Sequence, residues 1–451
     1  MAFRSGELVL AVLGRGRALR RHDRWTPAQL GAHQDRALSE LRQWAVRRSA
    51  FYRRFHAGRS DRPLTELPVL TKAVLMDHFD EISTRPDVRL ADLERYLAGP
   101  DAAGLFRGRW FVCATAGTTG RRGVFVWDRR GWVQVLASYN RAFDWAGVAA
   151  GLTRRVSMAV VSSTNPSHQS ARVGASVHSR WIPTLRIDSG DDVAGIVARL
   201  NAAQPQVLVG YASMLRLLAE EQVAGRLRVG PRFVFSASEV LTDSTRALAA
   251  QAWTIRPFNV YAATETSGIA ADCDRHAGMH LFEDLVITEV VDEHHRPIPA
   301  GTFGAKVLVT VLFSRTLPLI RYEMSDSVRL ATDQRCGCGR PYRLLDAIQG
   351  REQDTLRFPS LDGGGSRLVQ PIVFHHVMDD VAAAGWQIAQ RADGHLDVLL
   401  AHPRTVDPEA LAARLRSAVT ARGVAAPTVR VQIVDVIPRT PLGKARSSSA
   451  H

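Results

Sequence analysis

The alternation of apolar and polar positions divides the chain into regions of different secondary structure. Over residues 1–100 the apolar positions recur at helical spacing and predict a basic, helical region. From about residue 105, short apolar runs alternate with amphipathic stretches. Strands are expected at 110–114, 124–127, 156–161, 207–209, 233–235 and 258–261, and helices at 191–203, 213–224 and 243–252. Because strands that alternate with helices tend to form one sheet, this pattern predicts an α/β fold of layered subdomains with a largely parallel sheet.

The pattern changes twice more before the C-terminus. Three closely spaced apolar runs between 281 and 330 predict an antiparallel, β-rich subdomain or barrel. The residues after Arg351 predict a strand, a helix, two strands, a helix and a strand, at 369–374, 375–384, 386–390, 396–400, 408–422 and 429–436. We therefore expect a large N-terminal domain over 1–351, which begins with a basic helical extension over 1–65. A small, mobile α+β C-terminal domain is expected over 352–451.

Positive charge is concentrated near the N-terminus. The 451 residues are 46% apolar and 23% charged, which is typical of a folded globular protein. The 58 Lys and Arg against 44 Asp and Glu give a net charge of +14, and thirteen Arg against four acidic residues within 1–60 supply +9 of it. Only three of the basic residues are lysines, a skew that is more typical of a GC-rich genome than of nucleic-acid recognition. Nucleic acid is therefore disfavoured as a partner.

The sequence contains no apolar run of the length that a membrane span requires. The N-terminal run 8–13 is short, and Arg15, Arg17, Arg20 and Arg21 follow it. A signal peptide would instead carry its basic residues before the apolar run. We expect a cytoplasmic protein without a membrane partner.

The segment Thr115-Ala116-Gly117-Thr118-Thr119-Gly120 carries the clearest local chemical signal. Glycines and threonines between two apolar strands can surround a polyphosphate with backbone N–H groups and hydroxyls. The segment is not a P-loop, because the chain contains no Gly-Lys-Ser/Thr. An ordinary β-hairpin turn is the alternative interpretation.

Further segments follow in a characteristic order: Asn-Val-Tyr-Ala-Ala-Thr-Glu at 259–265, Leu-Ile-Arg-Tyr-Glu-Met-Ser-Asp at 319–326, Gly350-Arg351, and Pro-Arg-Thr-Pro-Leu-Gly-Lys at 438–444. Together with the Thr/Gly segment, they resemble the motifs of the adenylate-forming superfamily, which comprises the acyl-CoA synthetases and adenylation domains. Within it, segments 67–72, 210–213 and 278–284 are most similar to phenylacetate–CoA ligases. The resemblance covers about residues 65–445.

The resemblance implies a role for each matching residue. ATP would be bound by Thr115, Gly117, Thr118, Thr119, Gly120, Ser238, Glu239, Tyr261, Thr264, Asp326 and Arg351. Within this set, Tyr261 would stack on the adenine and Asp326 would bind the ribose hydroxyls. Glu265 would bind Mg²⁺, and Lys444 would bridge the acid carboxylate and the α-phosphate. Glu265 and Lys444 are thus the expected catalytic residues.

The implied reaction is ATP-dependent activation of a small, aromatic carboxylic acid to an acyl-adenylate, followed by transfer to CoA. Transfer to a carrier-protein pantetheine or to an amine stays open, as does a homodimer. A non-catalytic nucleotide- or nucleic-acid-binding protein is the alternative from another class. Two positions depart from the family pattern: Arg121-Arg122 replaces the usual Pro and Lys, and Gln353 replaces the usual hinge residue. The change at the hinge bears on the thioester step, because the resemblance implies that the C-terminal domain rotates about this hinge before that step.

The acid pocket is expected, by the same resemblance, near 162–170, Tyr211, Ala212 and 236–238. Polar side chains at Asn165, His168, Gln169 and Ser170 replace the glycine-rich, aromatic segment of phenylacetate ligases. We expect an acid more polar than phenylacetate, such as a hydroxylated or amino-substituted aromatic acid, with His168 facing it.

A separate group of residues has the spacing of a metal site. Cys336-Gly337-Cys338, the upstream Cys273 and a histidine would provide the three-Cys, one-His ligand set of a structural zinc site. His280 is the preferred fourth ligand and His276 the alternative. Reduced surface thiols without a metal are the other interpretation.

Overall fold

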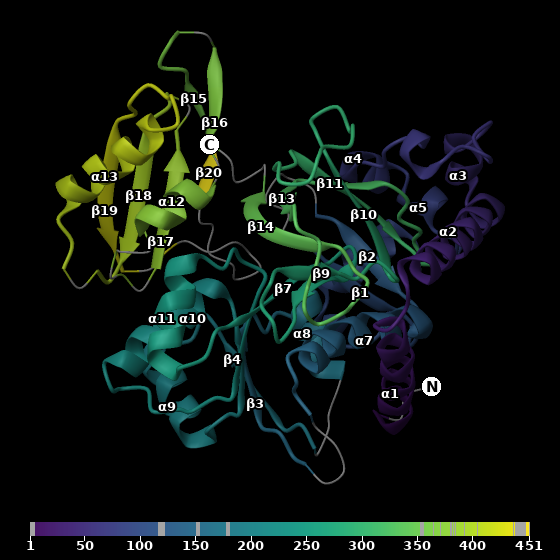
Figure 1. Ribbon diagram of the computed structural model, residues 1–451, viewed down its shortest axis with the longest axis horizontal. Helices are drawn as coiled ribbons and strands as arrows, with labels where there is room; N and C mark the ends of the chain where they lie inside the picture. Colours follow the sequence, from purple (N-terminus) through teal and green to yellow (C-terminus); the bar gives the residue numbers. More distant parts are fainter. Residues whose placement is uncertain are drawn as a thin grey trace.

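A computed structural model gives the fold of the chain (Figure 1). It describes residues 5–115, 122–149, 154–176, 181–351, 356–363, 365–369, 371–378, 381, 383, 385–391, 393–403, 405–435, 437 and 448–450. Within these residues, no helix has the length and apolar character needed to cross a bilayer. Three hydrophobic clusters form the core: a large one that begins at α1, one around β3–β6, and one in the C-terminal part of the chain.

Helices form the N-terminal region, on the right of Figure 1, as the sequence predicts. They are α1 (Ser5–His22), α2 (Pro27–Arg48), α3 (Ala50–Phe55), the 3₁₀ turn η1 (Leu64–Glu66), α4 (Lys72–Asp77), α5 (Phe79–Ile82), α6 (Leu90–Ala98) and the 3₁₀ turn η2 (Pro100–Ala103). A capping box begins α2, because Thr26 and Gln29 each accept a hydrogen bond from the other's backbone N–H. Leu30, Leu41 and Ala45 form the buried side of α2.

A nine-stranded sheet in the order β13-β14-β9-β8-β7-β6-β5-β3-β4 lies at the centre of the molecule. Its strands are β3 (Met158–Ser162), β4 (Thr184–Asp188), β5 (Val207–Gly210), β6 (Phe233–Ala237), β7 (Phe258–Ala263), β8 (Ser267–Asp272), β9 (Met279–Leu281), β13 (Asp326–Leu330) and β14 (Leu344–Arg351). Strands β4, β3, β5, β6 and β7 are parallel, and the pairs from β7 to β13 are antiparallel. The parallel half confirms the predicted α/β class.

Helices connect the parallel strands, and their positions determine which loops can form a site. The connecting helices are α8 (Gln169–Ser176), α9 (Val193–Ala203), α10 (Ala212–Val223) and α11 (Asp243–Trp253). Because all five parallel strands run the same way, the loops that follow them gather at one edge of the sheet. In folds of this kind that edge is where ligands bind.

Two smaller antiparallel units lie beside the large sheet. β1 (Phe111–Ala114) and β2 (Val124–Trp127) form a fully buried hairpin that leads into α7 (Arg129–Trp145). β10 (Val286–Val291), β11 (Lys306–Val311) and β12 (Tyr322–Met324) form the antiparallel sheet expected between 281 and 330. The last strand of that stretch, β13, instead joins the large sheet.

The C-terminal part of the chain forms its own sheet and core, at the upper left of Figure 1. Its elements are β15 (Leu356–Pro359), β16 (Ser366–Val369), α12 (Pro371–Met378), β17 (Gly385–Gln390), β18 (Leu396–Ala401), α13 (Pro408–Thr420), β19 (Val429–Val434) and β20 (Ser448–Ala450). The four-stranded sheet has the order β19-β18-β17-β20, and β15 pairs with β16 in a separate hairpin. We refer to residues 356–450 as the C-terminal unit.

One predicted boundary in the C-terminal unit is wrong. The expected strand at 369–374 ends at Val369, and α12 begins at Pro371, before the expected helix at 375–384. Proline suits the first turn of a helix, where its missing N–H is not needed. Val373, Phe374 and Val377 are buried at helical spacing, so their apolar run belongs to a helix face rather than to a strand.

Candidate active site and candidate metal centre

The base of the predicted phosphate-binding segment is held by the β1–β2 hairpin. The Thr115 backbone N–H donates to the Gly123 carbonyl at 2.8 Å, and the Gly123 N–H donates to the Thr115 hydroxyl at 2.9 Å. A Cβ at Gly123 would lie 2.9 Å from the Phe125 ring, so the close crossing requires glycine. Gly117, Thr118, Thr119 and Gly120 lie outside the described residues. The strands on either side of the segment do form a hairpin. This pairing does not decide whether the segment between them binds phosphate.

Hydrogen bonds connect this hairpin to the predicted acid-binding segment. The Ala114 N–H donates to the Ser167 carbonyl at 2.9 Å, and the Ser163 N–H donates to the Tyr211 hydroxyl at 3.0 Å. His168 and Tyr211 are both 6% exposed, and Ala212 is also buried. Burial raises the pKa of Tyr211, which keeps the phenol neutral. The three predicted pocket residues thus lie in two segments, one of which bonds directly to β1 and the other to the Ser163 backbone.

A third connection runs from the same segment to the end of β7. Gln169 accepts a hydrogen bond from the Tyr139 hydroxyl at 2.9 Å and donates to the Thr264 carbonyl at 3.2 Å. Tyr261 is buried on β7, and Glu265 is half-buried in the turn after it. The turn that carries Glu265 is therefore fixed from two sides, by the strand before it and by α8.

Ser238 and Glu239 follow β6, the strand beside β7. Ser238 is exposed and has a φ of 70°, an uncommon conformation for a residue other than glycine. The Glu239 carboxylate accepts a hydrogen bond at 2.9 Å from the Ser213 N–H in the first turn of α10. Its carboxylate thus contacts the N-terminus of α10, which fixes its position beside β6.

The remaining predicted ATP residues lie at the opposite end of the sheet. Asp326 opens β13, is buried, and pairs in register with Arg351 at the end of β14. Strands β9 and β8 separate this pair from β7 in the sheet order. Lys444 lies outside the described residues. Asp326 and Arg351 are therefore direct partners in one pair of strands. Hydrogen bonds connect a second group, which consists of the segments around Thr115, 163–169, Tyr211 and Thr264.

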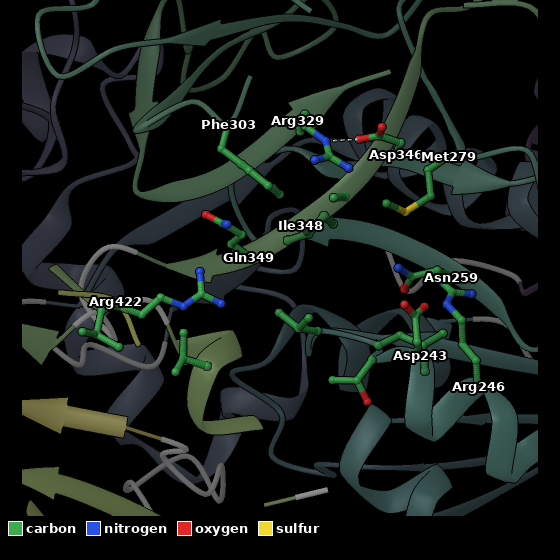
Figure 2. A pocket seen from close by; sticks show the side chains of 16 residues that line it. Asp243, Arg246, Asn259, Met279, Phe303, Arg329, Asp346, Ile348, Gln349 and Arg422 are labelled. Atoms are coloured by element: carbon green, nitrogen blue, oxygen red, sulfur yellow. Dashed lines mark hydrogen bonds and ion pairs between the residues drawn. The ribbon is translucent and has the colours of Figure 1, made fainter. Parts of the chain in front are cut away.

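A cavity of about 420 Å³ lies between these two ends of the sheet and the C-terminal unit (Figure 2). It is lined by residues after β6, by β14 and by Val373 and Arg422 of the C-terminal unit. Figure 2 shows the ion pair between Arg329 and Asp346 in its wall, with Nε and Oδ1 2.8 Å apart. The predicted ATP residues that the structure describes are absent from this lining, although Gln349 lies two residues before Arg351.

The four predicted metal ligands converge on one point. One ligand atom from each of Cys273, His280, Cys336 and Cys338 lies within 4.8 Å of every other. The sulfur atoms of Cys273 and Cys336 are 3.7 Å apart, and the Cys338 sulfur lies 3.2 Å from Nε2 of His280. A tetrahedron with Zn–S bonds of about 2.3 Å has S···S edges of about 3.8 Å. The donor set and its spacing therefore fit a closed zinc site.

The surroundings of the cluster favour metal binding by His280 rather than His276. Burial lowers the pKa of His280 to about 4, so the ring is neutral, which is the metal-binding form. Nδ1 of His280 lies 3.3 Å from the Tyr342 carbonyl, which orients Nε2 toward the sulfurs. The His276 ring instead packs against Phe258, with ring centroids 4.4 Å apart. His276 does not belong to the ligand group that the described residues form.

Sequence reasoning missed two residues that help to hold these sites in place. The Tyr139 hydroxyl on α7 donates to Gln169, and the backbone carbonyl of Tyr342, in the loop before β14, contacts Nδ1 of His280. Neither tyrosine lies in a motif, and each contacts its partner only through the tertiary fold.

Comparisons with known proteins find several phenylacetate-coenzyme A ligases and Protein CapK, although no protein-family model matches the chain. Phenylacetate-coenzyme A ligase of Escherichia coli (strain K12) is 29% identical over 310 residues, 64% of this chain and 64% of that protein. The enzyme of the same name from Pseudomonas putida is 30% identical over 260 residues, 54% of this chain and 55% of that protein. Protein CapK of Staphylococcus aureus is 22% identical over 393 residues, 85% of this chain and 79% of that protein. Among the phenylacetate-coenzyme A ligases, the chain matches between about a third and two thirds of each relative's length.

Solved structures share the fold over most of the chain. A 2-hydroxyisobutyryl-CoA ligase in the postadenylation state, in complex with 2-HIB-AMP, has a TM-score of 0.71 at 20% identity and covers 95% of this chain and 91% of its own. An anthranilate CoA ligase in complex with anthranoyl-AMP has a TM-score of 0.52 at 15% identity, over 74% of this chain and 64% of its own. At these identities the similarity establishes the fold.

Proposed function

Because the chain is homologous to phenylacetate–CoA ligases and has the fold of the adenylate-forming acyl-CoA ligases, we propose that it activates a small carboxylic acid with ATP and transfers the acyl group to CoA. The carboxylate oxygen would attack the α-phosphorus, the bond from that phosphorus to pyrophosphate would break, and an acyl-adenylate would remain. The CoA thiolate would then attack the acyl carbon, with AMP as the leaving group.

A set of hydrogen bonds between four predicted segments carries the proposal. Ala114 bonds to Ser167, Ser163 to Tyr211, and Gln169 to Thr264. These contacts bring the base of the phosphate segment, the acid segment and the turn before Glu265 together at the carboxyl edge of the parallel strands. A phosphate, a carboxylate and a metal ligand must meet in one place for acyl-adenylate formation. The contacts between segments far apart in the sequence support that requirement.

The residues at this edge have distinct tasks in the proposal. Glu265 is a half-buried carboxylate at a strand end, the donor type that Mg²⁺ prefers. When bound there, Mg²⁺ would neutralise phosphate charge. Lys444 would donate to the oxygens of the acid and the α-phosphate as charge develops on them. The chemistry needs no protein nucleophile, because the acid itself attacks phosphorus.

The thiol step involves a movement of the C-terminal unit in this proposal. Lys444 belongs to that unit, which has its own core and joins the large sheet after β14. Rotation about the residues near Gln353 would withdraw Lys444 and admit the thiol. CoA is the proposed acceptor because the relatives that match the chain carry CoA ligase in their names. A carrier protein or an amine is tested by the same experiment.

We propose a polar, ring-substituted aromatic acid as the substrate. His168 and Gln169 are buried in the segment beside Tyr211, and they would present polar groups where phenylacetate ligases have glycine and aromatic residues. A hydroxyl or amino substituent on the ring would find polar groups to contact in such a pocket.

Pyrophosphate exchange with a panel of acids tests the function directly. Radiolabelled pyrophosphate should enter ATP only when a cognate acid is present, and a hydroxy- or aminobenzoate should exceed phenylacetate. Adding CoA, pantetheine or an amine to the active mixture then identifies the acceptor. If no acid supports exchange while ATP still binds, the chain is a nucleotide-binding protein without this activity.

We also propose that the Cys273, His280, Cys336 and Cys338 cluster holds a structural zinc ion. All four positions are taken by protein donors, which leaves no open coordination site for catalysis. The ion would connect the β8–β9 turn to the loop between β13 and β14. Its role would be stability of the antiparallel half of the large sheet.

A further inference from the structure

The outer face of α1 carries exposed leucines and unpaired arginines. Leu10 is 70% exposed and Leu13 is 49% exposed, two of the few large apolar side chains that reach the surface of the described chain. Arg17 and Arg21 follow at helical spacing and are also exposed. Because positions three or four apart share one side of a helix, these four side chains form one continuous strip. We refer to Leu10, Leu13, Arg17 and Arg21 as the α1 strip.

The opposite face of α1 is anchored to the rest of the protein. Leu8 and Leu19 are buried in the large hydrophobic cluster. Arg15 donates to Gln134 on α7 at 2.6 Å, and Nδ1 of His22 lies 2.6 Å from the buried carboxylate of Asp284. Figure 1 shows α1 at the margin of the molecule, away from the C-terminal unit. The fold therefore presents the strip outward as a fixed surface.

The positive charge of the α1 strip is not neutralised by an ion pair with any described residue. No ion pair involves Arg17, Arg21 or the following Arg24 within the residues that the structure describes. By contrast, Arg20 on the flank of the same helix pairs with Asp144 at 2.6 Å. The whole segment 1–60 has a net charge of +9. A complementary partner must therefore be anionic and must also accept two leucines.

We propose that the α1 strip docks the protein on an anionic lipid bilayer. Leu10 and Leu13 would enter the boundary between headgroups and acyl chains, and Arg17 and Arg21 would contact lipid phosphates along the same line. The sequence-based expectation of no membrane partner rested on the short apolar run. A short apolar run cannot span a bilayer, but it can contact the bilayer surface. The orientation of the two leucines is visible only in the fold.

The same features argue against nucleic acid and against a second copy of the chain as the partner of the α1 strip. Nucleic acid would pair with Arg17 and Arg21 but would bury neither leucine in an apolar environment. A second copy of the chain would bring like charges together, and four side chains on one convex helix are far fewer than the roughly 20–30 residues per side of a stable interface. A fluid bilayer needs no shape complementarity, and its headgroups supply the counter-charge.

Vesicle co-sedimentation of the full chain tests the proposal. The probes are vesicles of phosphatidylcholine alone and vesicles of phosphatidylcholine mixed equally with phosphatidylglycerol. The protein should bind the mixed vesicles, bind phosphatidylcholine much more weakly, and be released by salt. Each arginine near an anionic surface contributes about fivefold to binding, so R17Q/R21Q should bind about 30-fold more weakly. L10S/L13S should lose at least about tenfold.

A matched control comes from the C-terminal unit. Arg430 and Ile433 on β19 are also exposed, and Ile433 is 63% exposed. The variant R430Q/I433S should bind mixed vesicles as the wild type does. Thermal melts should be equal for all three variants, because every changed side chain is exposed. Absence of vesicle binding, or equal loss in the α1 variants and the control, would overturn the proposal.

Two further outcomes would assign the strip to another partner and also overturn the proposal. Sedimentation velocity without lipid reports on self-association: a dimer that L10S/L13S converts to monomer would make the strip a contact between copies. Duplex DNA binding that R17Q/R21Q abolishes, with vesicle binding unchanged, would assign the arginines to nucleic acid.

Discussion

The metal centre and the edge where the acid is proposed to react are built in different ways. At the candidate metal centre, four side chains from the β8–β9 region and the loop before β14 converge, and each offers one ligand atom. At the edge of the parallel strands, hydrogen bonds between separate segments hold the predicted residues, such as Ala114 to Ser167 and the Ser163 backbone to the Tyr211 hydroxyl. One arrangement has the geometry of a closed ion site, and the other connects loops at the edge of a sheet.

This difference between the candidate metal centre and the edge of the parallel strands indicates which of the two can change shape during a reaction. A four-coordinate ion fixes its ligands, so the turns it joins must stay together. Single hydrogen bonds between loops are individually weak, and loops at a strand edge can adjust when a substrate enters or leaves. We therefore expect changes at the candidate metal centre to affect stability alone, and changes at the edge to affect catalysis as well.

The largest effect is expected from Lys444→Ala. Loss of one preorganised donor at the position of developing charge costs roughly 10²–10³ in rate, so acyl-adenylate formation should nearly cease while ATP binding persists. With presynthesised acyl-adenylate, the mutant should still form thioester at close to the wild-type rate, because the C-terminal unit has then carried Lys444 away. Equal failure of both half-reactions would contradict the proposed rotation.

Glu265→Gln should reduce pyrophosphate exchange by at least about a hundredfold, because it keeps the shape of the side chain but removes the charge that would bind Mg²⁺. The matched control is Glu409→Gln in the first turn of α13, which should exchange as the wild type does. A Glu265→Gln protein with near-normal exchange would show that the Mg²⁺ ligand lies elsewhere.

At the metal centre, Cys336→Ser should abolish zinc binding and lower the thermal stability. Elemental analysis of the wild type, purified without added metal, should find about one zinc per chain. The ion closes a long loop, because Cys273 and Cys336 are 63 positions apart. Cys113→Ala is the control, since the Cys113 thiol is buried on β1 outside the cluster. A metal-free wild type with the stability of the mutant would reject the zinc proposal.

The sequence predicts most of the parallel half of the fold and the metal cluster, for physical reasons that differ. Strands such as β5 and β6 are short apolar runs between helices, a pattern with one consistent solution. Only Gly337 separates Cys336 from Cys338, so half of the ligand set is local. The helical start of α12 was missed because a run such as Ile372-Val373-Phe374 fits a strand until the buried positions are known.

The loop contacts at the catalytic edge could not be predicted. Glu239 illustrates the reason: the motif suggests a nucleotide contact, and the contact of its carboxylate with the N-terminus of α10 is visible only in the fold. Tyr139 and Tyr342 act through partners that lie far away in the sequence, and no local spacing encodes such pairs. Motifs thus indicate which residues meet a substrate, and the fold decides what holds them there.

The smallest effects are expected from removing the hydroxyl of Tyr211, at the edge, and that of Tyr342, whose backbone carbonyl contacts His280. Comparing these two variants separates the two regions most directly. In Tyr211→Phe the Ser163 N–H loses its acceptor, and a buried unpaired donor costs about 1–3 kcal/mol. Because that bond holds the acid segment, the KM for the acid should rise severalfold while the KM for ATP changes little. Tyr342→Phe removes a hydroxyl that donates to Asp23 at 3.3 Å and accepts from Arg141 at 3.2 Å, while the backbone carbonyl that contacts His280 stays in place. This variant should lower the melting temperature and leave both KM values unchanged. If the two variants change the KM for the acid equally, the catalytic edge and the metal centre are coupled, and the division between a reactive region and a stabilising region does not hold.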